Sequence, residues 1–184
     1  MPERPRRVSV VGSSGSGKTT VARRLAAELD VPHVELDALH WGPGWSAASP
    51  AELSARIAEA TAGEAWVVDG NYWGKVGPQV WERADTVVWV SPPRWRTTWQ
   101  SVTRTLRRVV TRQELWNGNR ERWSGLAFWR GEDSVLWWAW TTYDRTQERY
   151  AAAMADPQWA HLTFHRLRTR RDVEHFLAGT RRAG

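Results

Sequence analysis

The chain is 184 residues long, which suits one domain with a hydrophobic core large enough to fold without cross-links. It contains no cysteine, which excludes disulfide bonds, thiol nucleophiles and metal centres held by cysteine. Its 26 lysines and arginines outnumber its 20 acidic residues and give a net charge of +6, which favours anionic partners such as phosphates, nucleic acids or membrane surfaces without choosing among them.

The first half of the sequence predicts strands that alternate with helices. Short runs rich in β-branched residues predict strands at residues 6–12, 33–36, 65–68 and 86–90. Apolar residues at helical spacing predict one helix over 18–29, and a capping signal at Ser49 predicts a second over 49–61. This alternation is typical of an α/β fold in which helices cover both faces of a parallel sheet and ligands bind at the carboxyl ends of the strands.

The second half is dominated by long helices. A helix is predicted from Arg94, and its apolar stripe is expected to pack against the rest of the protein. The stripe consists of Trp99, Val102, Leu106 and Val109. Residues 113–131 show no clear period and are predicted to form a loop or a small lid. A second long helix over 132–155, a strand over 162–167 and a helix over 171–177 complete the chain.

The organisation of the chain predicts one domain in a reducing compartment. Neither an internal repeat nor a linker is visible, so we expect a single domain over 1–184 with a lid over about 94–131. The apolar runs at 8–11 and 135–140 are far shorter than the ~18 residues of a membrane-spanning helix. We therefore expect a cytoplasmic protein with no membrane partner, and the sequence does not predict its oligomeric state.

Residues 12–19 carry the strongest functional signal. They read Gly-Ser-Ser-Gly-Ser-Gly-Lys-Thr and satisfy the pattern G-x-x-x-x-G-K-[ST] between a predicted strand and a predicted helix. In such a loop the backbone N–H groups surround phosphates, Lys18 reaches the β- and γ-phosphates, and the Thr19 hydroxyl holds Mg²⁺. The predicted nucleotide-binding residues are Gly12, Ser13, Ser14, Gly15, Ser16, Gly17, Lys18, Thr19 and Thr20. The sequence therefore predicts ATP and Mg²⁺ as cofactors, with GTP as the alternative nucleotide.

Two aspartates end predicted strands and are expected at the same edge of the sheet. Asp69 follows the apolar strand 65–68, where a P-loop protein places the carboxylate that holds Mg²⁺. Asp37 ends the second strand, where a carboxylate can orient an acceptor hydroxyl and take its proton. The alternatives are a turn aspartate before Gly70 and a capping or loop aspartate at 37.

The segment 94–130 contains nine arginines and only two acids. Transfer of a γ-phosphoryl group spreads negative charge over oxygens, and arginines delivered by a lid stabilise that charge. The candidates are Arg104, Arg108, Arg112 and Arg120. A solvated helix face is the alternative for each of them, and a nucleic-acid groove is another, because tryptophans interleave with the arginines.

Five motifs together resemble a known family. They read Gly-Ser-Ser-Gly-Ser-Gly-Lys-Thr-Thr (12–20), Leu-Asp-Ala-Leu-His-Trp-Gly-Pro-Gly-Trp (36–45), Trp-Val-Val-Asp-Gly-Asn-Tyr (66–72), Ala-Asp-Thr-Val-Val-Trp-Val (84–90) and Arg-Leu-Arg-Thr-Arg-Arg-Asp-Val-Glu-His-Phe-Leu (166–177). The chain resembles the P-loop nucleotide kinase clan and, within it, adenylate-kinase-like proteins often labelled DNA topology modulation proteins. The resemblance implies a five-stranded parallel sheet of order 2-3-1-4-5, a nucleotide clamped by the glycine loop, and an arginine lid between strands four and five.

The sequence also departs from the adenylate kinases. After the Asp-Gly pair those kinases continue with a Phe-Pro-Arg stretch that helps to seat AMP, whereas this chain continues as Asn71-Tyr72-Trp73 without an arginine. The residues carried over to an acceptor pocket are Asp37, Trp41, Gly70, Asn71 and Tyr72. The resemblance further implies a backbone contact between Arg168 and the adenine.

These features predict a Mg²⁺-dependent ATP phosphotransferase, a P-loop kinase, whose acceptor is a small molecule such as a nucleotide or nucleoside. The alternative is an ATP-switched regulatory module that binds nucleic acid or protein through the basic segment 94–130. A kinase hydrolyses little ATP until its acceptor arrives. A switch module hydrolyses ATP slowly without any small acceptor and binds nucleic acid in a salt-sensitive manner.

Overall fold

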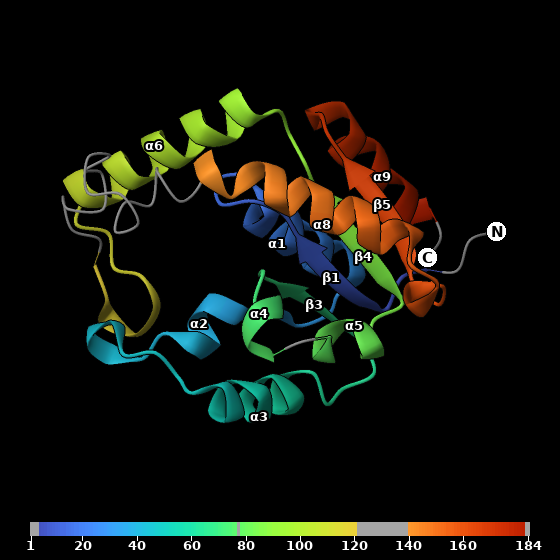
Figure 1. The fold of residues 1–184 in the computed structure, drawn as a ribbon, viewed down its shortest axis with the longest axis horizontal. Coiled ribbons are helices and arrows are strands. Elements are labelled where there is room, and N and C mark those ends of the chain that lie inside the picture. The colour runs from blue at the N-terminus through green and yellow to red at the C-terminus, as the bar shows by residue number, and fades with distance from the viewer. Residues whose placement is uncertain (1–3, 77, 121–139, 183–184) are drawn as a thin grey trace.

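The computed structural model of the chain describes residues 4–76, 78–120 and 140–182. Its centre is a five-stranded sheet of order β2-β3-β1-β4-β5 in which every neighbouring pair is parallel (Figure 1). The strands are β1 (Arg7–Val11), β2 (His33–Glu35), β3 (Trp66–Asp69), β4 (Thr86–Val90) and β5 (Thr163–Leu167). The predicted α/β fold and strand order are confirmed.

Helices cover both faces of the sheet. The helices are α1 (Lys18–Leu29), α2 (Leu36–His40), α3 (Pro50–Ala60), α4 (Trp73–Val76), α5 (Gln79–Arg83), α6 (Arg94–Val110), α8 (Tyr143–Ala155) and α9 (Arg170–Arg182). Single 3-10 turns lie at η1 (Pro43–Trp45), η2 (Trp116–Gly118) and η5 (Pro157–Trp159). Within the described ranges, no helix combines the length and the apolar character needed to cross a membrane.

The core is divided between the two faces because successive strand residues point to opposite sides. On one face, β1, β3 and β4 contribute Val8, Val67 and Val88 to a cluster completed by α1 and α9. On the other face, the neighbouring residues of β3 and β4, among them Trp66 and Trp89, pack with α3, α5 and α8. Strands buried on both faces explain why they read as nearly continuous apolar runs.

Tryptophans fill much of the second of these clusters. Trp66, Trp81, Trp89 and Trp159 are each less than 5% exposed. Trp81 meets Trp159 edge to face at 5.3 Å between ring centroids, an arrangement that aromatic pairs favour. Part of the unusual tryptophan content therefore serves the core.

The helix predicted after Ser49 begins as its capping signal indicates. The Ser49 hydroxyl accepts a hydrogen bond from the Glu52 N–H at 3.2 Å, and the Glu52 carboxylate accepts one from the Ser49 N–H at 2.8 Å. Pro50 occupies the first helical position, where its missing N–H costs nothing. This capping box fixes the start of α3.

The predicted packing stripe of α6 is wrong. Trp99 is 66% exposed and Leu106 is 45% exposed, and of the four stripe residues only Val109 is buried. The buried face instead carries the small side chains of Thr97, Ser101 and Thr105. The reason lies in the helix's neighbour: a Cβ added to Gly15 would lie 2.4 Å from the Thr97 carbonyl oxygen and 2.9 Å from the Ser101 Cβ. The backbone of α6 lies directly on the glycine loop, and this approach leaves no room for large side chains.

We expect mutation to destabilise the protein on the buried face of α6 and to have little effect on the exposed face. Ser101→Leu forces a large side chain between α6 and Gly15 and should lower the free energy of unfolding by about 1–3 kcal/mol. Trp99→Ser, on the exposed face, should change it by less than about 0.5 kcal/mol. Urea denaturation of both variants checks this. A larger loss for Trp99→Ser would reinstate the predicted stripe.

The other boundaries differ in smaller ways. β2 ends at Glu35 because Leu36 already begins α2, and α9 continues to Arg182, beyond the predicted end at 177. Of the helix predicted over 132–155, the structure describes α8 from Tyr143, with Tyr150 buried against the core. Residues 132–139 of that predicted helix, and residues 121–131 of the loop predicted over 113–131, lie outside the described ranges.

Candidate active site

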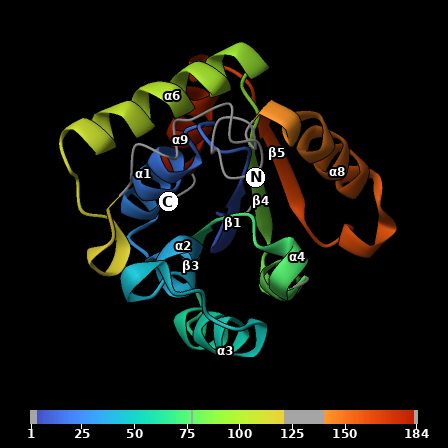
Figure 2. The same cartoon turned by 60° about the vertical axis from the view of Figure 1, so that its left-hand side comes forward.

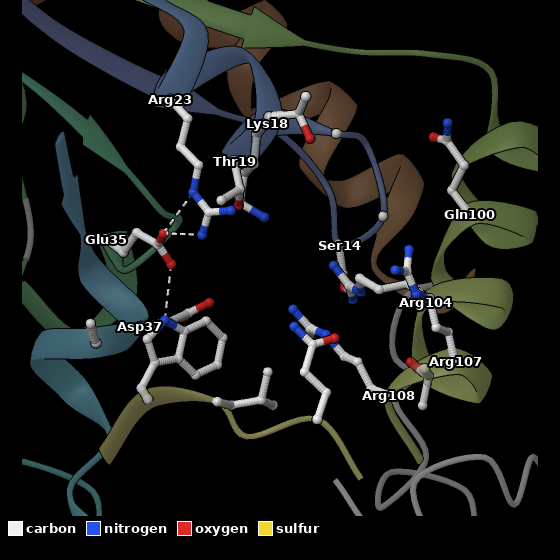
Figure 3. A pocket seen from close by; sticks show the side chains of 18 of the residues that line it. Ser14, Lys18, Thr19, Arg23, Glu35, Asp37, Gln100, Arg104, Arg107 and Arg108 are labelled. Carbon is white, nitrogen blue, oxygen red and sulfur yellow. Dashed lines mark hydrogen bonds and ion pairs between the residues drawn. The ribbon is translucent and has the colours of Figure 1, made fainter. Parts of the chain in front are cut away.

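A cavity of about 1400 Å³ opens beside the carboxyl ends of β1 and of the edge strand β2. Its walls come from the glycine loop and α1, from the end of β2 and the start of α2, and from α6 with the segment that follows it (Figure 3). Glu35 and Asp37 lie on one side of the space, and the arginines of α6 lie on the other (Figure 3). The site is therefore at the position that the strand pattern predicts for an α/β fold.

The glycine loop presents one edge of its backbone to this cavity. Gly15 and Gly17 have φ angles of 81° and 91°, a region that favours glycine, and the Ser16 N–H donates to the Ser13 carbonyl at 3.0 Å to close a tight turn. The predicted residues that line the cavity are Ser14, Gly15, Gly17, Lys18, Thr19 and Thr20. Gly12, Ser13 and Ser16 are buried and do not line the cavity.

Asp69 lies at the end of β3 and is only 5% exposed. Burial raises the pKa of its carboxyl group, although the nearby Lys18 ammonium and a hydrogen bond from the Thr19 hydroxyl work against this rise. Within the described part of the chain, its buried Oδ1 has no hydrogen-bond partner. A buried carboxylate oxygen left free beside a hydroxyl is a donor set that suits Mg²⁺. Thr19 and Asp69 therefore fit the predicted metal role.

Asp37 faces the cavity and is held from behind by an aromatic residue. The Tyr72 hydroxyl donates to Asp37 Oδ1 at 2.6 Å, and the Trp41 indole hydrogen-bonds to the same hydroxyl. Burial and the adjacent carboxylate raise the pKa of Tyr72, so its hydroxyl keeps its proton. Trp41 and Tyr72 are not among the residues that line the cavity. The structure places them as supports of Asp37.

Glu35 is a cavity residue that the sequence reasoning missed. It accepts hydrogen bonds from Arg23 Nε at 3.2 Å and from the Trp116 indole at 2.9 Å. Burial disfavours its charged form, but these two donors outweigh burial, and the net pKa of Glu35 is lowered. Its place at the end of β2, two residues before Asp37, is the only sequence signal that could have indicated it.

The arginines of α6 form the wall opposite Asp37 (Figure 3). Arg104 donates from Nη2 to the Ser14 Oγ at 3.0 Å, which puts its guanidinium at the glycine loop. The Arg108 guanidinium lies 6.0 Å from the centre of the Trp116 ring. The arginines that line the cavity are Arg23, Arg104, Arg107, Arg108 and Arg120, of which Arg23 and Arg107 were not predicted.

Two predicted arginines lie elsewhere. Arg112 is exposed just beyond α6 and is not among the cavity residues. Arg168 is exposed too, and its backbone N–H donates to Asp172 Oδ2 at 2.8 Å, at the start of α9. Neither residue lines the cavity as the structure stands.

Asn71 and Gly70, predicted as acceptor residues, also lie outside the main cavity. The Asn71 amide makes two hydrogen bonds to the backbone of Gly12: its Oδ1 accepts from the Gly12 N–H at 3.1 Å, and its Nδ2 donates to the Gly12 carbonyl. The same Oδ1 accepts from the Tyr150 hydroxyl at 2.9 Å. Asn71 thus contacts the glycine loop from behind.

The segment after α6 closes the cavity by docking on the segment after β2. Asn117 Nδ2 donates to the Trp41 carbonyl at 2.5 Å, and Asn119 Nδ2 donates to the Gly42 carbonyl at 2.9 Å. The Trp45 N–H donates in return to Asn119 Oδ1 at 2.8 Å. In Figure 1 the yellow segment that leaves α6 accordingly reaches the region of α2. Figure 2 shows α6 running across the top of the molecule toward this contact.

Replacing Asn119 should loosen this contact. Asn119 is 3% exposed and pairs with backbone groups on both segments, so Asn119→Ala leaves the Trp45 N–H without its acceptor. We expect hydrogen exchange at the Trp45 amide to quicken about tenfold. The exposed Gln158→Ala serves as the control. An unchanged exchange rate would mean that Asn119 does not hold the segment.

Comparison with known proteins agrees with this description of the loop and the fold. The sequence model of the family described as "ATPase family associated with various cellular activities (AAA)" matches residues 8–68, about a third of the chain. Curated protein sequences give no match. The family match covers the strand, glycine loop and helix that hold residues 12–19, and the five-stranded parallel sheet has the strand order of P-loop kinases.

Three solved structures illustrate that fold. A gluconokinase from Sinorhizobium meliloti superposes with a TM-score of 0.53 at 20% identity, over 98% of this chain and 94% of that one. A shikimate kinase from Acinetobacter baumannii, in complex with shikimate, gives 0.55 at 14% identity over 96% and 91%. A shikimate kinase from Bacteroides thetaiotaomicron gives 0.51 at 14% identity over 97% and 97%. At these identities the likeness concerns the fold.

Proposed function

We propose that the protein is an ATP phosphotransferase that uses Mg²⁺ and moves the γ-phosphoryl group to a hydroxyl of a small acceptor. The observation that carries this proposal is the arrangement of the cavity: Lys18 and Arg104 at the glycine loop lie across the same space from Asp37. One side is built to bind phosphates. The other offers a carboxylate to an acceptor hydroxyl.

The size of the cavity supports two ligands. Pockets for a single small molecule typically measure about 300–1,000 Å³. The cavity here is about 1400 Å³, and its lining includes Lys18 and five arginines, among them Arg104 and Arg120. ATP and a small acceptor can therefore occupy it together. The kinase structures with this fold support a sugar acid or a hydroxy acid as acceptor, and the resemblance to adenylate-kinase-like proteins supports a nucleotide or nucleoside.

The proposed reaction assigns a role to each wall. The acceptor oxygen forms a bond to the γ-phosphorus, the bond between that phosphorus and the bridging oxygen breaks, and ADP leaves with the electron pair. The hydroxyl proton passes to Asp37. Lys18 and Arg104 stabilise the charge that develops on the transferring group. Thr19 and Asp69 would hold Mg²⁺, which when bound neutralises charge on the phosphates.

The placement of the arginines favours this reading over a nucleic-acid switch. Arg104, Arg107, Arg108 and Arg120 line the cavity. The α6 side chains of Trp95 and Trp99 are 71% and 66% exposed. A groove for nucleic acid would need several aromatic side chains beside the basic ones. Of the three tryptophans in residues 94–120, Trp116 lines the cavity with the arginines, but Trp95 and Trp99 do not.

The test is ADP release from Mg·ATP against a panel of nucleoside monophosphates, nucleosides, sugar acids, small hydroxy acids and short DNA or RNA. The Lys18→Ala protein is the blank. We expect one small compound to stimulate release in the wild type and not in the blank. Stimulation by nucleic acid alone, or DNA binding with no stimulation by any compound, would contradict the proposal and support the switch module.

A further inference from the structure

Three consecutive residues after β3 contact both halves of the proposed site. Gly70 approaches Leu36, the residue before Asp37, so closely that an added Cβ would lie 2.7 Å from the Leu36 Cβ. Its N–H donates to the Val10 carbonyl at 3.3 Å, on the strand that leads into the glycine loop. The backbone at Gly70 therefore lies between the two elements whose separation matters for transfer.

Asn71 fixes the phosphate half. Its amide pairs with both the N–H and the carbonyl of Gly12, the first residue of the glycine loop. A primary amide that pairs with the N–H and the carbonyl of one residue holds the two peptide groups on either side of its Cα, and so restricts both the position and the orientation of Gly12. The Tyr150 hydroxyl donates to the same amide oxygen at 2.9 Å. Tyr150 belongs to α8, is only 4% exposed and is part of the core. Asn71 is thus anchored from behind.

Tyr72 fixes the acceptor half. Its hydroxyl donates a hydrogen bond to Asp37 Oδ1 at 2.6 Å. Its ring centroid lies 4.9 Å from that of His40, which is fully buried. The Trp41 indole hydrogen-bonds to the hydroxyl and so helps to orient its proton toward Asp37. With one carboxylate oxygen held from behind, the rotation of Asp37 is restricted, and the carboxylate faces the cavity that it lines.

We propose that Asn71 and Tyr72 are positioning residues, and that together they set the separation of the ATP phosphates from Asp37. This inference rests on the proposed phosphotransferase function. It replaces the predicted role of both residues as walls of the acceptor pocket. Asn71 affects the binding of ATP, because it contacts the glycine loop, and Tyr72 affects the acceptor, because it contacts Asp37.

The test uses two variants with opposite expected signatures. Tyr72→Phe keeps the ring and removes the hydrogen bond to Asp37, so kcat with the acceptor should fall about tenfold while the Kd for ATP stays within twofold. The ratio of ADP formed to acceptor phosphorylated should rise above one, because water competes with a poorly oriented acceptor. Asn71→Ala should raise the Kd for ATP about tenfold and leave the acceptor KM at saturating ATP within twofold.

Tyr143→Phe is the matched control. It removes one phenolic hydroxyl that donates to the Pro92 carbonyl at 2.8 Å, away from the cavity, and should match the wild type in every parameter. Thermal unfolding without ligands shows whether each variant folds. Should Asn71→Ala fail to fold, Tyr72→Phe alone decides.

Two results would overturn the inference. One is a Tyr72→Phe protein with wild-type kcat and one ADP per phosphorylated acceptor. The other is an equal loss of ATP affinity and acceptor turnover in both variants with a lowered thermal midpoint, which would mark a purely structural role. These failures are distinct from failure of the proposed function, in which the wild type itself shows no turnover that depends on an acceptor.

Discussion

Lys18→Ala is expected to abolish turnover, with a loss of at least about a hundredfold, and to leave the thermal midpoint of the ATP-free protein nearly unchanged. The ammonium group lines the cavity at the glycine loop, where the negative charge of the transferring group develops. Because the side chain faces this cavity, its removal costs little core packing. ADP release in the presence of the stimulating acceptor and thermal unfolding without ATP give the two readouts.

Arg145→Ala is the matched control, because Arg145 is an exposed cation on α8. It removes the same charge from the molecule and should leave turnover at the wild-type level. A Lys18→Ala protein as active as the wild type would show that the glycine loop does not serve phosphoryl transfer. A thermal midpoint that falls strongly would show that Lys18 supports the fold instead.

Asp37→Asn is expected to lower transfer to the acceptor by about a hundredfold while ATP still raises the thermal midpoint as it does in the wild type. The amide has nearly the same shape and can still accept the hydrogen bond from Tyr72, but it cannot take a proton from the acceptor hydroxyl. ATP binding depends on the glycine loop across the cavity and should not change.

The control for this substitution is Asp30→Asn. Asp30 is exposed after α1 with a φ of 56°, a conformation that asparagine adopts readily. It should behave as the wild type. Unchanged transfer in Asp37→Asn would remove Asp37 from the reaction, and a lost response to ATP would place it in nucleotide binding.

The sequence was sufficient for features that depend on local chemistry. The strand runs, the capping box at Ser49 and the glycine loop are each indicated by residue types that lie within a few positions of one another, and the structure has them close to where they were predicted. The order of the sheet followed from the family resemblance and is confirmed. Asp37 and Asp69 lie near the loop because parallel strands bring their carboxyl ends to one edge.

The orientation of α6 could not be predicted from its own residues. Its apolar stripe is clear in the sequence, but its neighbour is the backbone at Gly15, which admits only small side chains such as Ser101. Tertiary packing therefore overrode amphipathicity. The contacts of Glu35 with Trp116, and of Asn119 with Trp45, join residues more than 70 positions apart, and no local pattern indicates them.

The central claim is that the γ-phosphoryl group ends on a small acceptor, and the most direct test follows that group itself. ATP labelled at the γ-phosphorus would be incubated with the protein and the compound that stimulates ADP release, and the labelled products would be separated. We expect the label on the acceptor in a one-to-one ratio with ADP, and none there with Lys18→Ala. Label found only in inorganic phosphate, whatever compound is added, would contradict the assignment as a phosphotransferase.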